Sequence, residues 1–161
     1  WHPIFQDYQD TVLIVDKGQK KVSSTLGHGL MQGHPFATQR FEQAHSHLEQ
    51  LKSALTTGDL EHFIDLTEAE ALTLHAMMMT SNPRFVLMQP NTLAILQKVV
   101  DYRAQTNRPL CFTLDAGANV HLLYPRQDRS PIMDFIQKEL LIHCQQGQYI
   151  QDQVGNGSKK I

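Results

Sequence analysis

The stretch PLCFTLDAGANVHLLYP, residues 109–125, decides the fold. Two short apolar runs flank a turn of small residues, a pattern that predicts two antiparallel strands joined as a hairpin. Asp115 ends the first run and is followed by Ala116 and Gly117, which keep side chains away and would let a ligand approach the backbone. Gly117 can also take a positive φ at no steric cost. Asp115 is therefore either a carboxylate that accepts a proton or orients a hydroxyl group, or a turn residue that binds its own backbone.

The rest of the chain predicts strands and helices that do not alternate singly. A β-branched run at residues 10–18 predicts a strand before the hairpin, and residues 147–157 predict a final edge strand. Apolar spacing and capping residues predict amphipathic helices at 35–59, 59–81, 91–107 and 130–144. We therefore expect an α+β fold, an antiparallel sheet with helices packed on one face, rather than a doubly wound fold.

The helix predicted at residues 35–59 carries a regular apolar stripe that we expect to face the core. Its members recur at steps of three and four residues, the spacing of one face of an amphipathic helix. They are Phe41, Ala44, Leu48, Leu51 and Leu55. After the second helix, prolines bound residues 85–88, where a short extended piece fits.

Composition and charge exclude several classes of protein. The 161 residues fit one domain, residues 1–161, and the balance of 41% hydrophobic and 19% charged residues is that of a globular chain. A formal net charge of −2 argues against a general nucleic-acid binder. The sequence shows neither a signal peptide nor an apolar run of membrane-spanning length, so we expect a cytoplasmic protein with no membrane partner. Cys111 and Cys144 lie in apolar contexts and are expected to be reduced, partly buried thiols.

A second candidate site lies in the loop at residues 19–35. It combines two adjacent lysines, three consecutive hydroxyl side chains and several glycines. Hydroxyl donors, positive charge and accessible backbone N–H groups suit an anion, above all phosphate. The spacing of a P-loop is absent, and an ordinary polar loop is the alternative. The hydroxyl residues are Ser23, Ser24 and Thr25.

The histidines predict no metal site. The chain has nine, but no cysteine or carboxylate completes a ligand set beside the pair that flanks the glycine-rich loop. His45 and His47 are two residues apart on a predicted helix and point to different sides. His75 lies on an apolar helical stripe and is expected to be a core histidine. We therefore assign no transition-metal ligand.

Three segments taken together carry a resemblance to a known family. They are KKVSSTLGHGLM (20–31), ALTLHAMMMTSNP (71–83) and CFTLDAGANVHLLYP (111–125), in this order with helical spacers. The chain resembles the C-terminal part of diphosphomevalonate decarboxylases, members of the GHMP kinase superfamily, over nearly its whole length. The family pattern F-T-x-D-A-G-P-N reads FTLDAGAN here, with Ala118 in place of proline. In the loop that contains Ser23, Ser24 and Thr25, called the serine loop below, His28 replaces the usual methionine of the family.

The resemblance implies a fold, a reaction and site residues. The fold would be the ferredoxin-like GHMP kinase C-terminal domain. Family members use ATP and Mg²⁺ to phosphorylate the 3-hydroxyl of (R)-mevalonate 5-diphosphate, and loss of phosphate and CO₂ then gives isopentenyl diphosphate. The catalytic aspartate of the family falls on Asp115, and a homodimer is common. The substrate-binding residues would be Ser23, Ser24, Thr25, Ala116 and Gly117.

The ATP-binding half of such an enzyme is not recognisable in this sequence. The glycine- and serine-rich ATP loop belongs to the N-terminal domain of the family, and no such stretch occurs here. We therefore expect a C-terminal domain, inactive alone, whose partners are its own N-terminal domain, ATP and the substrate. Two alternatives stay open: a kinase of the same superfamily that phosphorylates without decarboxylation, and a non-catalytic α+β binding or dimerisation module. Convergence of Asp115 and the serine loop on one cleft would favour the enzyme.

Overall fold

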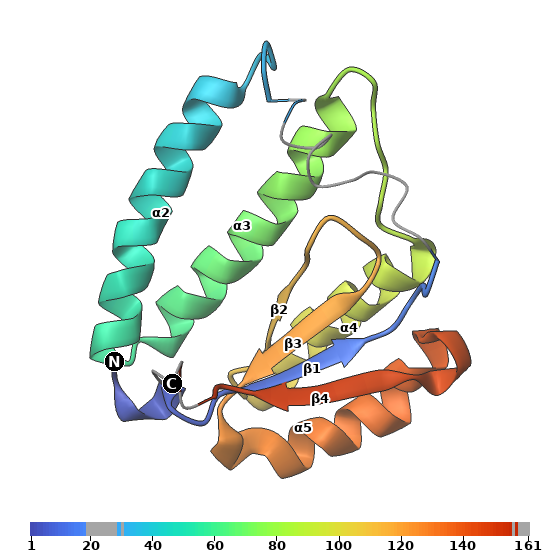
Figure 1. Cartoon of the computed structure of the whole chain (residues 1–161). Helices are drawn as coiled ribbons and strands as arrows, with labels where there is room; N and C mark the ends of the chain where they lie inside the picture. Colours follow the sequence, from blue (N-terminus) through green and yellow to red (C-terminus); the bar gives the residue numbers. More distant parts are fainter. Residues whose placement is uncertain (19–28, 30, 156, 158–161) are drawn as a thin grey trace, which may run out of the picture.

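The computed structural model describes residues 1–18, 29, 31–155 and 157. Its strands form one antiparallel sheet in the order β2-β3-β1-β4 (Figure 1). They are β1 (Gln9–Leu13), β2 (Cys111–Thr113), β3 (Val120–Tyr124) and β4 (Tyr149–Gln153). The hairpin predicted at residues 109–125 is confirmed as β2 and β3, and the predicted final strand is confirmed as β4.

The two central strands give the sheet a buried face and an open face. Side chains alternate along a strand, and in β1 Thr11 and Leu13 are buried while Asp10 and Val12 are only half-buried. Strand β3 shows the same alternation, with His121 among its half-buried positions. One face of the sheet is therefore core, and the other presents polar groups to its surroundings.

The helices lie on the buried face and beside one edge of the sheet. They are α2 (Ala37–Thr57), α3 (Leu60–Thr80), α4 (Pro90–Thr106) and α5 (Arg129–Phe135). Shorter helical turns are η1 (Pro3–Phe5), η2 (Arg126–Asp128), η3 (Ile136–Leu140), η4 (Leu141–His143) and η5 (Gln145–Gly147). None of the helices in the described part of the chain combines the length and apolar character that a membrane crossing requires.

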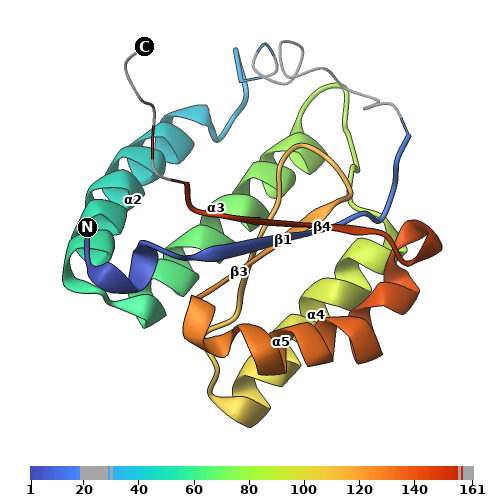
Figure 2. The same cartoon turned by 60° about the horizontal axis from the view of Figure 1, so that its bottom comes forward.

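Helices α4 and α5 cover the buried face of the sheet (Figure 2). Ile95 and Val99 of α4 and Ile132 of α5 are fully buried, and they share one core cluster with Leu13 and Leu122 of the strands. Burial of a side chain of this size contributes about 1.5–3 kcal/mol. This layer is the main core, and it confirms the α+β class with helices packed on one face of an antiparallel sheet.

Helices α2 and α3 form a hairpin that stands beside β2 (Figure 1). Gly58 ends α2 in the left-handed conformation, with φ of 81°, and the Asp59 carboxylate caps α3 by accepting a hydrogen bond from the His62 amide at 3.0 Å. At the base of the hairpin, Phe63 packs on Phe5 with ring centroids 5.1 Å apart. A second, smaller core cluster therefore anchors the hairpin to the N-terminal turn.

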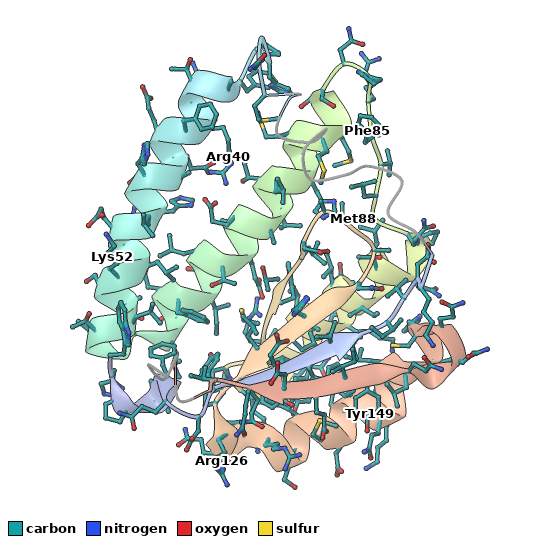
Figure 3. The ribbon with its side chains drawn as sticks, in the orientation of Figure 1. Arg40, Lys52, Phe85, Met88, Arg126 and Tyr149 are labelled. Atoms are coloured by element: carbon teal, nitrogen blue, oxygen red, sulfur yellow. The ribbon has the colours of Figure 1, made fainter. Side chains whose placement is uncertain are left out.

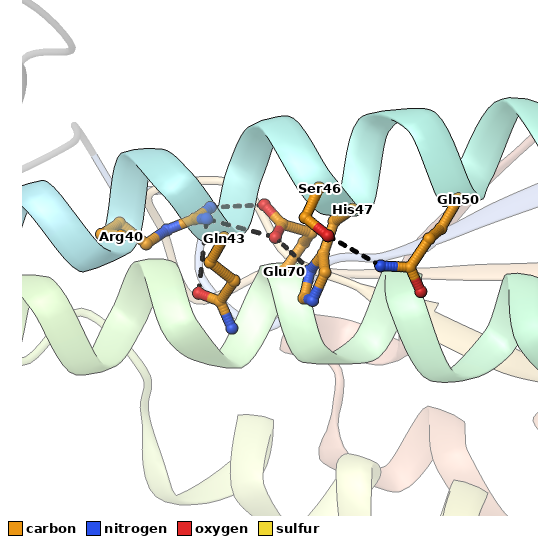
Figure 4. Close-up of polar contacts among 6 residues, drawn as sticks. All are labelled: Arg40, Gln43, Ser46, His47, Gln50 and Glu70. Carbon is orange, nitrogen blue, oxygen red and sulfur yellow. Dashed lines mark hydrogen bonds and ion pairs between the residues drawn. The ribbon is translucent and has the colours of Figure 1, made fainter.

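The upper part of α2 contacts α3 through polar groups, which corrects the predicted stripe. Phe41 is 53% exposed and Leu48 is 48% exposed, so these members do not face the core. Instead, Glu70 of α3 accepts hydrogen bonds from both guanidinium nitrogens of Arg40 and contacts Nδ1 of His47 at 2.6 Å (Figure 4). The prediction that this part of the stripe faces the core is wrong, because α2 lies outside the helices and strands of the main core. Among its residues, those near the C-terminal end reach the second core cluster.

Two smaller predictions have different outcomes. The residues 85–88, where an extended piece was expected, are assigned to neither strand nor helix. Cys111 and Cys144 are buried free cysteines, as predicted. Burial raises the pKa of the Cys144 thiol to about 11 and raises the pKa of Cys111 as well, so both stay protonated near neutral pH.

Candidate functional site

A hollow of about 620 Å³ opens on the face of the sheet that α4 and α5 leave uncovered. One wall is the turn 115–119 between β2 and β3, and another comes from Val12 and Ile14 on and just after β1. Val86, Leu87 and Gln89, from the chain between α3 and α4, and the start of β4 at Tyr149 form the other sides. Figure 3 labels Phe85 and Met88 of the same segment, together with Tyr149. The hollow therefore gathers four segments that are far apart in sequence around Asp115.

The backbone of Asp115 is held by a buried histidine. The Asp115 carbonyl oxygen accepts hydrogen bonds from the Gly117 amide at 2.7 Å and from Nε2 of His75 at 3.0 Å. His75 is only 1% exposed, which confirms the predicted core histidine. Burial lowers the pKa of His75, against the opposing effects of the hydrogen bond to Asp115 and of its charge. A neutral imidazole that faces a carbonyl carries its hydrogen on that nitrogen, so α3 directly fixes the start of the turn.

Two further side chains tie the same turn to other elements. Thr92, in the first turn of α4, donates its hydroxyl to the Ala118 carbonyl oxygen at 2.6 Å. Asn119 turns its amide oxygen to the end of β1, where it accepts hydrogen bonds from the amides of Val15 at 2.9 Å and Asp16 at 3.0 Å. Together with His75, these bonds hold the turn from α3, α4 and β1. Bonds from three elements of the fold itself therefore position the turn, the kind of fixed arrangement that favours preorganisation of a site.

Gly117 is required for space rather than for backbone conformation. It does not adopt the left-handed region, so its freedom to take a positive φ is not used. A Cβ atom at this position would lie 3.1 Å from Oδ1 of Asp115, closer than most such contacts. Ala116 and Gly117 both line the hollow beside Asp115. The small residues therefore leave the carboxylate room at the wall of the hollow.

The predicted phosphate-binding residues Ser23, Ser24 and Thr25 lie outside the described residues. The segment that leads toward them is described up to Gly18. Lys17 and Gly18 line the same hollow as Asp115. Through Asn119, the amide of Asp16 in this segment is bonded to the turn that carries Asp115. The approach to the serine loop thus reaches the hollow.

An ion pair on the open face of the sheet was not predicted from the sequence. Nδ1 of His121 lies 2.9 Å from Oδ2 and 3.1 Å from Oδ1 of Asp10, and His121 lines the hollow with Asp115. The hydrogen bond with Asp10 raises the pKa of His121, burial opposes this, and the charges of Asp10 and Asp115 raise it further. The alternation of side chains along each strand could have predicted that both residues lie on the polar face. Their contact could not be predicted, because no local sequence signal gives the register between β1 and β3.

The described residues offer no ligand set for a metal ion. No group of three or more histidine, cysteine, aspartate or glutamate side chains within them has suitable geometry. Asp16, Asp115 and His121 do line the hollow, but His121 is paired with Asp10, which is not among the lining residues. The chemistry that this part of the chain offers is a positioned carboxylate, an imidazole–carboxylate pair and one lysine around a preorganised turn.

Comparison with known proteins gives one family and several relatives. Residues 11–160 match the family described as "Mevalonate 5-diphosphate decarboxylase C-terminal domain". Over 83 residues, 52% of this chain and 26% of the relative, the sequence is 31% identical to a phosphomevalonate decarboxylase of Haloferax volcanii. Over 129 residues, 79% of this chain and 35% of the relative, it is 24% identical to a diphosphomevalonate decarboxylase of Candida albicans. The chain thus spans about a third or less of these curated relatives.

Solved structures with the same fold include mevalonate pyrophosphate decarboxylase from Streptococcus pyogenes. The two superpose with a TM-score of 0.84 at 24% identity, over 96% of this chain and 47% of that one. A second, "MDDEF in complex with MVAPP, AMPPCP and Magnesium", has a TM-score of 0.80 at 23% identity and covers 91% of this chain and 43% of that one. Likeness at this identity shows the fold, and the chain spans about half the length of these structures.

Proposed function

The chain belongs to the mevalonate 5-diphosphate decarboxylase C-terminal domain family, and from this premise we propose that it is the C-terminal domain of an ATP-dependent decarboxylase of (R)-mevalonate 5-diphosphate. The observation that carries the proposal is the placement of Asp115. Its turn is held from α3, α4 and β1, and it lines a hollow together with Lys17 and Gly18 of the segment that precedes the serine loop.

Asp115 would act on the 3-hydroxyl group of the substrate. A carboxylate within hydrogen-bond distance of a hydroxyl group can orient it or accept its proton as the oxygen attacks. Phosphoryl transfer needs positioning and charge neutralisation more than covalent chemistry, so a rigid turn suits the task. The three anchors of the turn supply that rigidity without contacting the reacting atoms.

The proposed reaction balances in two steps. The 3-oxygen attacks the γ-phosphorus of ATP, its proton passes to Asp115 or to solvent, and ADP leaves. The C3–O bond then breaks with phosphate as the leaving group. The electrons of the C1–C2 bond form the new double bond as CO₂ departs, which gives isopentenyl diphosphate. Positive charge that develops at C3 would be stabilised by a fixed carboxylate nearby.

ATP and Mg²⁺ would be held mainly outside the described part of this chain. Mg²⁺ is commonly held by one or two carboxylates together with phosphate oxygens of the substrate, and the described residues contain no group of three or more metal-binding side chains. We therefore assign both to the proposed N-terminal domain and to the phosphates themselves. Within this chain, Lys17 and the predicted binding residues Ser23, Ser24 and Thr25 would contribute to phosphate binding. A homodimer is part of the same proposal.

A second candidate function differs in the substrate. The Haloferax volcanii relative, a phosphomevalonate decarboxylase, is 31% identical over its aligned part, which is higher than the 24% of the Candida albicans relative. The substrate would then carry one 5-phosphate group rather than a diphosphate. Asp115 would have the same role in both reactions, since the two substrates share the 3-hydroxyl and the carboxylate.

The test uses the full-length protein that contains this chain. It is supplied with ATP, Mg²⁺ and either mevalonate 5-diphosphate or mevalonate 5-phosphate, and the release of CO₂ and ADP is followed. We expect CO₂ from one of the two substrates, and Asp115→Asn to lower kcat by about 10²–10⁴-fold. Asp65→Asn, which changes an exposed carboxylate on α3 outside the hollow, is the matched control and should not alter kcat.

Three results would contradict the proposal in different ways. ADP formed without CO₂ would mean a kinase of the same superfamily that stops after phosphorylation. Neither product, from a folded protein that binds neither substrate, would favour the non-catalytic module. Activity of Asp115→Asn equal to that of Asp65→Asn would remove Asp115 from the chemistry.

A further inference from the structure

A carboxylate–imidazole pair spans two strands on the open face of the sheet. In the register of β1 and β3, His121 is opposite Val12 and Asp10 is opposite Leu123, so Asp10 and His121 are diagonal neighbours on one face. Their side chains are 31% and 32% exposed, and Nδ1 of His121 is 2.9 Å from the Asp10 carboxylate. The mechanism proposed for Asp115 makes no use of this pair.

We propose that His121 is a further substrate-binding residue, which donates a hydrogen bond from Nε2 to an anionic oxygen of the substrate in the hollow. The anionic group is a carboxylate or a phosphate. The identity of the substrate rests on the proposed function, but the anion site itself does not. Asp10 is the positioning residue that orients the ring.

The geometry of the pair assigns the roles of the two ring nitrogens. Nδ1 is engaged by Asp10, which fixes the ring and places a hydrogen on that nitrogen. Nε2 is then the nitrogen that remains for a ligand. When the ring is protonated, Nε2 is a charged donor, and a charge-assisted hydrogen bond to a carboxylate or phosphate is stronger than a neutral one. The raised pKa of His121 favours that protonated form near neutral pH.

The walls of the hollow favour a ligand with both apolar and anionic parts. Val12, Ile14 and Ile150 line it with aliphatic surface, while the cationic side chains among its described lining residues are Lys17 and His121. A branched hydroxy acid could place its hydroxyl group at Asp115, its methyl group on the aliphatic wall and an anionic group at His121.

Other charged and titratable groups surround His121 and bear on its charge. Asp10 is on β1 and Asp115 is on the adjoining turn. Asp16 and Lys17 follow β1 at the rim, and Tyr149 begins β4 on the other side of β1. Asp152 of β4 is the cross-strand partner of Asp10. The charges of Asp10 and Asp115 favour the protonated form of His121, and Asp10 is paired with His121 itself. A bound anion would therefore meet the two carboxylates together with the cationic groups of His121 and Lys17.

The direct test is an NMR titration of the His121 ring in the full-length protein. Inorganic pyrophosphate is the phosphate probe, and unphosphorylated mevalonate is the carboxylate probe. We expect at least one of them to shift the His121 ring resonances and to raise the pKa of His121, because a bound anion stabilises the imidazolium form. A response to pyrophosphate alone assigns the site to phosphate, and a response to mevalonate alone assigns it to the carboxylate. No response to either probe overturns the proposal.

Kinetics supply the second test. His121→Gln keeps a neutral donor but removes the charge, and we expect KM for the substrate to rise about tenfold at pH 6, with kcat changed less. In the wild type, KM should rise as the pH rises through the pKa of His121, since the charged donor is lost. Asp10→Asn should move that rise to lower pH. His45→Gln, at an exposed position on α2, is the matched control and should leave KM unchanged.

The outcomes separate this inference from the proposed function. A His121 response to an anion in a protein that releases no CO₂ supports the anion site and overturns only the decarboxylase. CO₂ release with an unchanged KM in His121→Gln overturns the anion site and leaves the decarboxylase standing. A higher KM that does not depend on pH, with no ring response, means that His121 is only structural and also overturns the inference.

Discussion

Nε2 of His75 lies 3.0 Å from the backbone carbonyl oxygen of Asp115. This bond joins the C-terminal third of α3 to the turn that carries the candidate catalytic carboxylate. The imidazole is buried, so water cannot readily replace it as a donor. The position of Asp115 therefore depends on the packing of α3 against the edge of the sheet.

Replacement of His75 should impair catalysis through the position of Asp115. His75→Leu removes the donor, and we expect a loss of about 1–3 kcal/mol in the free energy of unfolding and a lower kcat with little change in KM. His75→Gln supplies an amide donor and should restore part of kcat. Urea unfolding and steady-state kinetics check this. Equal kcat values in the Leu and Gln variants would mean that the hydrogen bond does not matter for the position of Asp115.

The same histidine should make the protein less stable at acid pH. Burial lowers the pKa of His75 below its ordinary value of 6.5, so the unfolded chain binds this proton more readily than the folded one. Its contribution is complete above pH 6.5 and is lost as the pH falls toward the folded pKa. In His75→Gln, this part of the acid destabilisation should vanish. The measurement is the unfolding free energy of the wild type minus that of His75→Gln, at each pH from 5 to 8. His121 titrates in both proteins, so its opposite effect on stability cancels in this difference. A difference that does not vary with pH would contradict the prediction.

Thr92 should contribute to stability through its hydroxyl group. This group donates to the Ala118 carbonyl oxygen at 2.6 Å and accepts from the Gln89 amide at 3.1 Å, in a fully buried position. Thr92→Val keeps the shape but leaves both partners unsatisfied, so we expect a loss of about 1–3 kcal/mol in urea unfolding. Thr92→Ser retains the hydroxyl and should lose clearly less. A Thr92→Val variant as stable as the wild type would mean that the two hydrogen bonds contribute nothing to stability.

Gly117 should be sensitive in activity rather than in stability. A Cβ there would crowd Oδ1 of Asp115 at 3.1 Å, while the backbone is not in the left-handed region. Gly117→Ala should therefore lower kcat severalfold and leave the melting temperature within a few degrees. Gly155→Ala, where a Cβ would meet nothing within 4 Å, is the control. If the melting temperature fell sharply while the remaining folded protein kept its full kcat, the glycine would be needed for stability and not for the position of the Asp115 carboxylate.

The sequence predicts the hairpin around Asp115 because all of its signals are local. Two apolar runs and a small-residue turn lie within 17 residues, and strand alternation then gives the faces. The bonds that hold the turn have no such signal. His75 is 40 residues from Asp115 and Thr92 is 26 residues from Ala118, so only the packing of α3 and α4 brings them together. The anchors of the site therefore appear only in the folded chain.

The pair formed by Asp10 and His121 escaped prediction for a related reason. The two residues are 111 positions apart in the sequence, and each by itself resembles an ordinary polar side chain on the open face of a sheet. Their contact depends on the register of β1 against β3, which a shift of one residue would abolish. The apolar stripe of α2 failed differently. Periodicity indicates one face of a helix, but it does not say how much of that face finds a partner.

The contact that replaces apolar packing at the top of α2 gives the last prediction. Glu70 binds Arg40 and His47 of α2 together, and it is 34% exposed, so water screens these pairs in part (Figure 4). We expect Glu70→Gln to cost about 1 kcal/mol in unfolding free energy. Glu49→Gln is the control, because Glu49 pairs with Lys52 on an exposed face of α2 itself and its loss should cost almost nothing. The sharper measurement is amide hydrogen exchange. Glu70→Gln should speed exchange over residues 37–50, where polar contacts hold α2 to α3, and should spare residues 51–57, which reach the second core cluster. If exchange became faster by the same factor along the whole of α2, the helix would open as one unit. Its apolar contacts at residues 51–57 would then hold it, and the Glu70 pairs would not hold its N-terminal part separately.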